Sequence, residues 1–575
     1  MIKVYVLNEI TIFNVLVRSA LGYDTYVLEV SAHLPIFNPI LSRAHDFLTR
    51  FDSVKDARVL APEMQLVWDY PLRTLFYDVF GKTEAWHNNQ FGYSNINLPN
   101  KIDVFAYKQV TCNYMKPAHI RVLKIDSINK AVPKGTVSYS GIDSDTAGLF
   151  DAFTADKTEK INLSRPKKWL RSFINFSLGF AIVSYSVAWI LSRTRLGSLQ
   201  PKNYFLGADF YLNPSDFKLY DAASVGGDVL LVKRNRTQPT DKFELAAYDK
   251  CEVTDGRFDV KAAILAIQQA FQDTLNYYAA YRTLRPAHYY LVSSIIYKRA
   301  MFHALFHRFK IKHFWCRDEY NVEHILRREQ LNRIGGKAYG VIHGFPTYTT
   351  HSPMWHYISF DTFYVHSSAL YNETTKKTWD ENMIVSPVGS FNAKEPDFAL
   401  MGSPRSDDIV IYTSAFVGLP TMVSFVRQLA TEFPERTIFL QLKKSFSETP
   451  LGKSFFKDCI EGLTNVKQTN APLFELLCTK KYGFSDPSSV VIEGLQFGQY
   501  TFFADLMREQ VSSILRDYPE ICVRDAHQAA ARIRAIEAGD ESDFFARLSG
   551  LVHFSKTPFI GVFRKDIGLT DSSLK

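Results

Sequence analysis

The chain has few features of a secreted, zinc-binding or nucleic-acid-binding protein. Its six cysteines are scattered and form no Cys-x-x-Cys pair, which excludes a zinc ribbon and is typical of a reduced cytoplasmic protein. The first residues, MIKVYVLNEITIFNVLV, have no clearly basic segment and no small-residue cleavage site, so we expect no secretory signal. We find no internal repeat, no long low-complexity tract and no nucleic-acid-binding module, and we expect no nucleic-acid partner.

Length and composition are those of a multidomain globular protein. A chain of 575 residues exceeds what one hydrophobic core normally serves, so two or more domains are expected. Hydrophobic residues make up 46% and charged residues 22% of the chain, which is ordinary for a globular protein. The net charge of +8 is modest but unevenly spread, and its basic stretches suit phosphates, anionic lipid or an acidic acceptor.

One uncharged segment complicates this picture. Ser172 to Ser192 contains no charged residue and lies between Arg171 and Arg193. Its length is sufficient to cross a bilayer, yet it contains several serines and has positive charge on both sides. Three interpretations stay open, namely a buried core helix, an interfacial helix on anionic lipid and a true span. We take it only as a candidate for peripheral membrane attachment.

The most informative stretch for function reads YGFSDPSSVVIEGLQFGQYTFFAD. A helix is predicted to begin at Ser488 and Ser489, with Glu493 about one turn inside, and to end at Gly498. A helix start with free N–H groups and serine hydroxyls can bind an anion, and Glu493 would reach the ribose hydroxyls of a nucleotide held there. The alternative is an ordinary capped helix of an α/β domain.

The residues before this helix predict a parallel sheet. Strands are expected at Asp408 to Thr413 and Thr437 to Leu442, with a helix between them at Thr421 to Glu432. Ligands of such sheets bind at the carboxyl ends of the strands. The candidate donor-binding residues are therefore Thr413, Ser414, Lys443, Ser488, Ser489 and Glu493, with Arg317 as a further phosphate partner.

Several motifs in a fixed order resemble one enzyme family. These are FWCRDEYNVEHILRR, AYGVIHGFP, FDTFYVHSS, IVSPVGS and the late Ser-Ser-x-x-x-Glu-Gly helix start. Together they are similar to bacterial GT-B glycosyltransferases of capsule and lipopolysaccharide synthesis, and distantly to Kdo transferases and teichoic-acid polymerases. The resemblance covers roughly residues 311–510 and implies an α/β fold with two Rossmann-like domains, whose parallel sheets face an interdomain cleft.

The resemblance does not reach the first 300 residues, but the sequence pattern and the resemblance together predict a domain plan. Residues 1–395 would form an N-terminal α/β acceptor-side domain, with a hydrophobic helical insertion near 165–195. Residues 396–535 would form the nucleotide-sugar donor domain, and the tail 536–575 would cross back onto the N-terminal domain. Within the first part we expect strands at 1–6, 25–30, 57–67 and 104–110, and a polar loop over 132–164.

The proton-transfer candidates lie at strand ends in the middle of the chain. Asp318 and Glu319 follow a predicted strand, and His343 follows the next one, immediately before Gly344. Asp318 can act as a base or nucleophile, or simply cap the following helix. His343 can bind the donor phosphate or accept a proton, or be a structural turn residue.

No metal and no cofactor are expected. The only Asp-x-Asp string, at Asp143 and Asp145, lies in a polar stretch and is predicted to be a solvated turn. In GT-B enzymes helix N-termini and basic side chains usually replace a metal at the departing phosphate. The Lys-Pro-His-Pro type of strand end found in polyol-phosphate polymerases is replaced here by Leu442-Lys443-Lys444-Ser445, which favours glycosyl transfer.

The leading hypothesis is a metal-independent glycosyltransferase of cell-surface glycan synthesis. It would move a sugar from a nucleotide-sugar donor to a polysaccharide or lipid-linked acceptor, in the cytoplasm at the inner face of the membrane. CMP-, UDP- and GDP-activated sugars stay open as donors. The alternatives are a CDP-polyol phosphotransferase of the teichoic type, a non-catalytic GT-B-like glycan-binding scaffold and a nucleotide-sugar epimerase.

Overall fold

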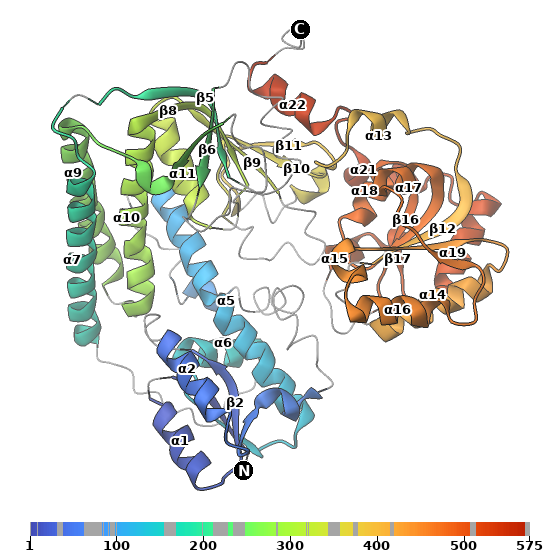
Figure 1. Ribbon diagram of the computed structural model, residues 1–575, viewed down its shortest axis with the longest axis horizontal. Coiled ribbons are helices and arrows are strands. Elements are labelled where there is room, and N and C mark those ends of the chain that lie inside the picture. The colour runs from blue at the N-terminus through green and yellow to red at the C-terminus, as the bar shows by residue number, and fades with distance from the viewer. Residues whose placement is uncertain are drawn as a thin grey trace. The chain divides into compact units, whose positions relative to one another are not determined.

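The computed structural model contains two compact units, and both are α/β (Figure 1). Unit 1 contains Met1–Ser192 and Ile264–Ala300, and unit 2 contains Arg193–Ala263, Met301–Thr350 and Trp355–Lys575. The structure describes residues 2–8, 10–31, 38–62, 83, 85–89, 91, 98, 101–154, 168–197, 199–210, 228–233, 248–282, 284, 286–317, 319, 321–342, 357–371, 378–413, 419–506 and 513–569. The domain ranges predicted from the sequence stay predictions.

Unit 1 is built on a parallel sheet in the order β3-β2-β1-β4. Its strands and the two helices between them are β1 (Ile2–Leu7), α1 (Ile12–Ala20), β2 (Thr25–Val30), α2 (Asn38–Leu48), β3 (Val54–Asp56) and β4 (Val137–Ser140). The strands predicted at 1–6 and 25–30 are confirmed. The strand predicted at 57–67 was wrong for its first part, because residues 57–60 form a 3-10 turn that Asp56 caps, and β3 lies before this turn. Residues 63–67 lie outside the described residues.

The strand predicted at 104–110 was wrong, and so was the loop predicted at 132–164 as far as residue 154; residues 155–164 lie outside the described residues. Residues 104–110 lie inside the long helix α5 (Lys101–Ala131), and the supposed loop contains β4 and the helix α6 (Ser144–Thr154). In α5 the buried side chains Asp103, Ala106 and Val110 recur at steps of three and four residues. That spacing is helical, and the apolar residues between them made the segment look like a buried strand.

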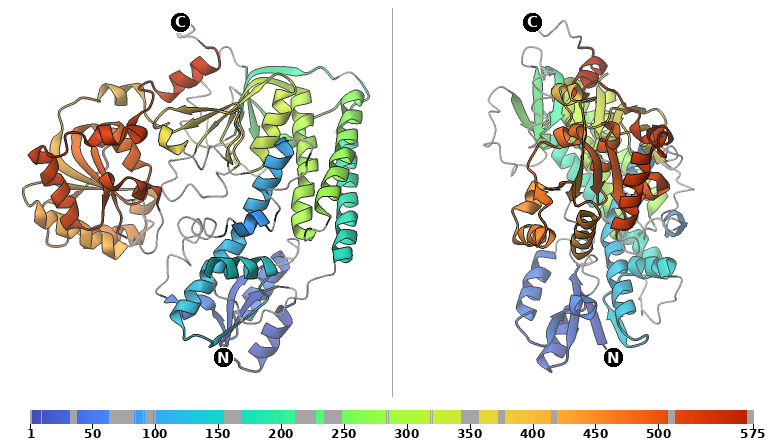
Figure 2. Two further views of the ribbon diagram at one scale, coloured as in Figure 1. Left: turned by 180° about the vertical axis from the view of Figure 1, so that it is seen from behind. Right: turned by 90° about the vertical axis from the view of Figure 1, so that its right-hand side faces the viewer.

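Three helices lie side by side in unit 1 (Figures 1 and 2). They are α7 (Lys168–Ser192), α9 (Val260–Tyr281, which belongs to unit 1 from Ile264) and α10 (Pro286–Arg308, which belongs to it as far as Ala300). Helix α10 begins at Pro286, and proline fits the first turn of a helix because its missing N–H would have no partner there. Among the described residues, α7 is the helix long and apolar enough to cross a membrane by length and composition.

Unit 2 contains a sheet of seven described strands, all parallel, in the order β11-β10-β9-β8-β5-β6-β7. They are β5 (Lys202–Asp209), β6 (Val229–Lys233), β7 (Asp249–Glu252), β8 (Phe309–Cys316), β9 (Lys337–Val341), β10 (Thr362–Val365) and β11 (Ile384–Pro387), and α11 (Glu323–Asn332) connects β8 to β9. The direction of the strand order reverses between β5 and β8. This reversal is where open parallel sheets bind ligands.

A second parallel sheet of unit 2 has the order β14-β13-β12-β15-β16-β17 and reverses between β12 and β15. Its strands are β12 (Ser406–Thr413), β13 (Ile438–Leu442), β14 (Val466–Gln468), β15 (Lys480–Ser485), β16 (Tyr500–Ala504) and β17 (Cys522–Val523). Helices α14 (Leu419–Glu432), α16 (Pro450–Ile460) and α19 (Ala526–Ala538) cover one face, and α17 (Leu473–Thr479), α18 (Val490–Gln496) and α21 (Ser549–Val552) the other (Figure 1). The alternation of strands and helices predicted for this region is confirmed.

The C-terminal segment of unit 2 returns to the seven-stranded sheet. Helix α22 (Phe559–Asp566) places Phe559 and Phe563 in the same core as Trp315 of β8 and Tyr364 of β10. The ring centroids of Trp315 and Phe563 are 5.1 Å apart. The last helix is therefore part of the core of a sheet that ends about 170 residues earlier in the chain. The predicted α/β class with parallel Rossmann-like sheets is confirmed.

Candidate functional site

The candidate site is the edge of unit 2 where the strands of both sheets end. In the six-stranded sheet, Thr413 ends β12 and Lys443 follows β13, and the amide of Lys443 donates to the Thr413 carbonyl at 3.2 Å. Ser488 and Ser489 lie between β15 and α18. Because β12 and β15 are neighbours, the structure brings these predicted residues to the reversal point of the sheet.

Helix α18 begins where the sequence predicted, with Ser489 as its N-cap residue. Neither serine is tightly bonded to the helix, since Ser489 makes no side-chain cap bond and Ser488 accepts from the Val490 amide at 3.4 Å. Both side chains are half-buried. The helix has seven residues, so its dipole alone is weak, and a phosphate here would depend on side-chain donors as well.

Glu493 is a buried carboxylate of α18 at this edge of the sheets. The Ser390 hydroxyl donates to Glu493 Oε1 at 2.5 Å, and the Glu493 side chain is 4% exposed. Burial raises the pKa of Glu493, and the Ser390 hydrogen bond offsets part of that rise. The sequence placed Glu493 correctly about one turn inside the helix, and its role at a ribose stays a prediction.

Ser390 reaches Glu493 through a turn that requires glycine. It follows β11, and Gly389 before it has φ +74°, a left-handed backbone conformation. A Cβ at Gly389 would lie 2.3 Å from the Phe554 ring. The Val-Gly-Ser motif therefore links the end of the seven-stranded sheet to α18 through the hydrogen bond from Ser390 to Glu493. The spacing of the motifs in the sequence did not predict this contact.

Gln496 makes a second link between α18 and the seven-stranded sheet. Its Nε2 donates to the carbonyl of His366, just after β10, at 2.7 Å and to the carbonyl of Leu551 at 3.2 Å. Burial lowers the pKa of His366 to about 3, so its imidazole is neutral at neutral pH. Glu493 and Gln496 are three residues apart and so lie on one side of α18.

Unpartnered polar atoms collect at these strand ends. Among the described residues, buried atoms without a hydrogen-bond partner include His366 Nδ1, Ser367 Oγ, Thr413 Oγ1 and Gln496 Oε1. A buried polar atom left unpaired costs about 1–3 kcal/mol, so such atoms normally meet a water molecule or a ligand. Sequence reasoning identified Thr413 but missed Ser367, Ser390 and Gln496 as site residues.

The remaining predicted residues belong to the reversal point of the seven-stranded sheet or lie outside the described residues. The Arg317 amide donates to Asp209 Oδ2 at 3.2 Å, between the ends of β8 and β5, and Arg327 Nη1 donates to the same oxygen at 2.8 Å. Glu319 is fully buried. Asp318, His343 and Ser414 lie outside the described residues, so their catalytic and donor-binding roles stay predictions.

The Asp-x-Asp string has a structural role in unit 1. Asp143 Oδ1 accepts from the Asp145 and Thr146 amides at the start of α6, and its Oδ2 pairs with Arg121. Asp145 Oδ2 lies 3.2 Å from His288 Nε2. The predicted solvated turn was wrong here, because these carboxylates cap a helix and pair with neighbours. No cluster of three or more metal-ligating side chains occurs among the described residues.

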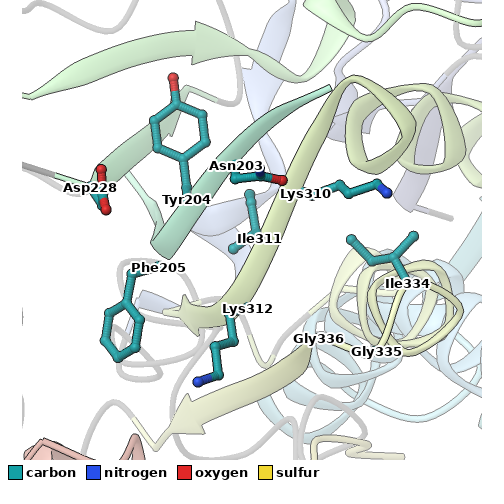
Figure 3. A pocket seen from close by; sticks show the side chains of 10 residues that line it. All are labelled: Asn203, Tyr204, Phe205, Asp228, Lys310, Ile311, Lys312, Ile334, Gly335 and Gly336. Carbon is teal, nitrogen blue, oxygen red and sulfur yellow. The ribbon is translucent and has the colours of Figure 1, made fainter. Parts of the chain in front are cut away.

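A cavity of about 350 Å³ lies at the opposite edge of the seven-stranded sheet (Figure 3). It is lined by Asn203, Tyr204 and Phe205 of β5, Lys310, Ile311 and Lys312 of β8, and Asp228, Ile334, Gly335 and Gly336. The strand residues are those with which β5 and β8 begin. Because ligands of parallel sheets bind at the carboxyl ends, this cavity is not our candidate donor site.

Comparison with known proteins gives remote structural matches. No family model matches the chain, and no curated protein matches it. Solved structures similar to it include the glycotransferase of kitacinnamycin, which is 14% identical, with 64% of this chain and 99% of that chain covered and a TM-score of 0.35. UGT2 of Phytolacca americana, solved with UDP-2-fluoroglucose and pterostilbene, is 10% identical, with 63% and 99% covered and a TM-score of 0.35.

The wall teichoic acid polymerase TagF is a third match, 10% identical, with 70% of this chain and 97% of that chain covered and a TM-score of 0.35. UDP-N-acetylglucosamine 2-epimerases also occur among the matches. The similarity to GT-B glycosyltransferases stays a prediction, because each of these matches has a TM-score of only 0.35. At such low TM-scores we rest no residue role, donor or acceptor on them.

Proposed function

We propose that this protein is a metal-independent glycosyltransferase that uses a nucleotide-sugar donor. The observation that carries the proposal is the polar edge around α18, where Ser390 holds Glu493 and Gln496 holds the end of β10. Buried, unpartnered donors and acceptors on His366, Ser367 and Thr413 line the same strand ends. A nucleoside phosphate, with its many oxygens and ribose hydroxyls, is the ligand class that would satisfy such groups.

The proposed roles follow from position and charge. Ser488, Ser489 and the first amides of α18 would donate to phosphate oxygens, and Lys443 would supply positive charge beside them. Glu493 would accept hydrogen bonds from the ribose, oriented by Ser390. Arg317 and Lys443 together would stabilise the charge of the departing nucleotide, which is the task that a metal performs in other transferases.

Acid–base chemistry is assigned to the ends of the seven-stranded sheet. Asp318, with Glu319 and His343 as further candidates, would accept the proton of the acceptor hydroxyl as the bond from the sugar to phosphate breaks. The acceptor is proposed to be a growing glycan or a lipid-linked sugar. The protein would work in the cytoplasm at the inner face of the membrane.

A thermal-shift screen against CMP, CDP, UDP, GDP and their sugars tests the donor site. The matching nucleotide should raise the melting temperature, because a ligand that binds only the folded state stabilises it. Asp318→Ala should keep this shift and abolish transfer. No shift with any nucleotide would contradict the proposal.

Turnover then separates the alternatives. Use of CDP-glycerol without any nucleotide-sugar would indicate a polyol phosphotransferase. Isomerisation of a sugar nucleotide without an acceptor would indicate an epimerase. Nucleotide binding without hydrolysis or transfer would indicate a glycan-binding scaffold.

A further inference from the structure

Helix α7 presents a stripe of large apolar side chains to solvent. Trp169, Phe173, Phe176 and Phe180 are each between 56% and 67% exposed. They follow one another at steps of four, three and four residues, so they lie on one face of the helix. Soluble proteins seldom leave so many large aromatic side chains uncovered along one line.

Helix α9 extends this apolar surface. Its residues Ile264, Leu265, Phe271 and Leu275 are each between 51% and 63% exposed. The two helices are in direct contact, since the hydroxyls of Ser172 and Tyr278 are 3.0 Å apart and the Phe176 and Tyr278 ring centroids are 5.6 Å apart. We call the exposed apolar residues of both helices the α7–α9 surface. The two helices themselves lie side by side in Figures 1 and 2.

The α7–α9 surface carries no exposed charge along its length. Residues 172–192 include no charged residue, and residues 264–281 include only Asp273. Asp273 is 3% exposed and is bound to Arg299 and Gln269 behind the surface. A water-facing surface without charges is costly to expose, whereas the boundary of a lipid bilayer would accept it.

Basic residues stand at both ends of these helices. Arg171 lies in the first turn of α7 and Arg193 follows its last residue, while Lys261 lies in the first turn of α9 and Arg282 follows its last residue. An apolar strip with cations at its ends matches the layout of an anionic membrane, with acyl chains beneath and negative head groups at the border. This charge complementarity favours anionic lipid over a second copy of the chain. In a dimer, the basic residues of one copy would lie near the basic residues of the other and repel them.

The inner face of α7 excludes a transmembrane orientation in this fold. Asn175 Nδ2 donates to the carbonyls of Arg282 and Leu284 at 3.0 and 2.8 Å, immediately after the end of α9. The Trp189 and Tyr297 rings are 5.5 Å apart, and a Cβ on Gly179 would lie 2.7 Å from the Tyr289 hydroxyl. A spanning helix would have to leave these partners or draw the buried Asp273–Arg299 pair into lipid.

We propose that the α7–α9 surface lies flat in the interface of a membrane that contains anionic lipid. The aromatic stripe of α7 and the aliphatic residues of α9 enter the acyl boundary, and the terminal arginines and lysine contact phosphate head groups. This inference rests on the membrane location in the proposed function, but vesicle binding is measured separately from nucleotide binding and transfer.

The test is sedimentation of the full-length chain with vesicles of phosphatidylcholine, with and without phosphatidylglycerol. Binding is expected with the anionic vesicles, and it should weaken as salt is added. Phe180→Glu should weaken vesicle binding by about tenfold or more, because it places a charge where an aromatic ring would enter the bilayer. Leu451→Glu on α16, where the leucine is 54% exposed, is the matched control and should bind as the unaltered protein does.

Several outcomes would overturn the inference. Equal vesicle binding by Phe180→Glu and the unaltered protein would remove the α7–α9 surface from the contact. Resistance of the bound protein to alkaline carbonate would indicate a spanning helix. A dimer in light scattering that Phe180→Glu dissociates, together with no vesicle binding, would assign the surface to a second copy. A retained nucleotide thermal shift in Phe180→Glu keeps failure of membrane binding distinct from failure of the donor site.

Discussion

The hydroxyl of Tyr364 donates to Asp566 Oδ2 at 2.7 Å, joining β10 to the last turn of α22 across 202 positions of sequence. The same helix inserts Phe559 and Phe563 beneath the strands. Unit 2 is thus closed by a C-terminal helix that belongs to the core of its seven-stranded sheet. Stability of this sheet should depend more on the apolar contact than on the hydrogen bond.

Two substitutions separate these contributions. Phe563→Ala should lower the free energy of unfolding by about 3–5 kcal/mol, because a fully buried aromatic side chain leaves a cavity. Tyr364→Phe removes one hydrogen bond to an exposed carboxylate and should cost about 0.5–1.5 kcal/mol. Urea unfolding measures both values. Equal costs would mean that the hydrogen bond contributes as much as the buried ring, which would contradict the prediction.

The alternation of strands and helices in unit 2 was predictable because its central strands are short apolar runs, and residues 409–413 of β12 are buried on both faces. Runs such as residues 409–412 and 438–442 are short, apolar and flanked by polar turns. The rule that a short apolar run indicates a buried strand failed for residues 104–110. They belong to the helix α5, which is buried on several sides and therefore also has a run of apolar residues. Periodicity cannot separate the two cases in a window of seven residues.

The positions of candidate site residues were predictable where these residues end a strand or begin a helix. Thr413, Lys443, Ser489 and Glu493 follow from local patterns. The hydrogen bond between Ser390 and Glu493 joins residues 103 positions apart and depends on how two sheets meet, which no local pattern records. His366 and Gln496 were overlooked as site residues for the same reason.

The N-cap serine of α18 should matter for nucleotide binding more than for folding. Ser489→Ala should reduce the nucleotide-induced thermal shift, because a hydroxyl donor near the phosphates is lost. Its effect on stability should be small, since Ser489 makes no side-chain cap bond. Ser454→Ala, at an exposed position of α16, is the matched control. Similar shifts in both variants would remove Ser489 from the site.

Two buried glutamines offer a matched pair. Gln496 bonds the carbonyls of His366 and Leu551, whereas Gln499 bonds those of Leu476 and Lys480 inside the six-stranded sheet unit. Replacing either by Met leaves buried carbonyls unpaired and should cost about 1–3 kcal/mol in urea unfolding. Of the two variants, only Gln496→Met should also weaken nucleotide binding, measured by calorimetry, because it removes the hydrogen bond to the His366 carbonyl just after β10. Weaker binding in both variants would indicate a general loss of structure.

We expect the buried carboxyl of Glu493 to lower the stability of the folded chain at neutral pH while it contributes to nucleotide binding. Because burial raises its pKa above the usual value of 4.5, the folded chain retains a proton that the unfolded chain releases. The contribution of Glu493 to the free energy of unfolding therefore falls as pH rises from its pKa in the unfolded chain through its higher pKa in the folded chain. Glu493→Gln removes the titration, so its free energy of unfolding should fall less steeply as pH rises above the usual pKa value of 4.5.

The same variant should bind nucleotide more weakly, because a neutral amide is a poorer acceptor for ribose hydroxyls than a carboxylate. Urea unfolding across the pH range and calorimetry with the matching nucleotide measure the two effects. Glu475→Gln, at an exposed position of α17, is the control and should change neither. A variant that is more stable at neutral pH yet binds less nucleotide would identify Glu493 as a residue retained for its ligand. Unchanged binding would exclude the ribose role and leave Ser390 and Glu493 as a structural pair.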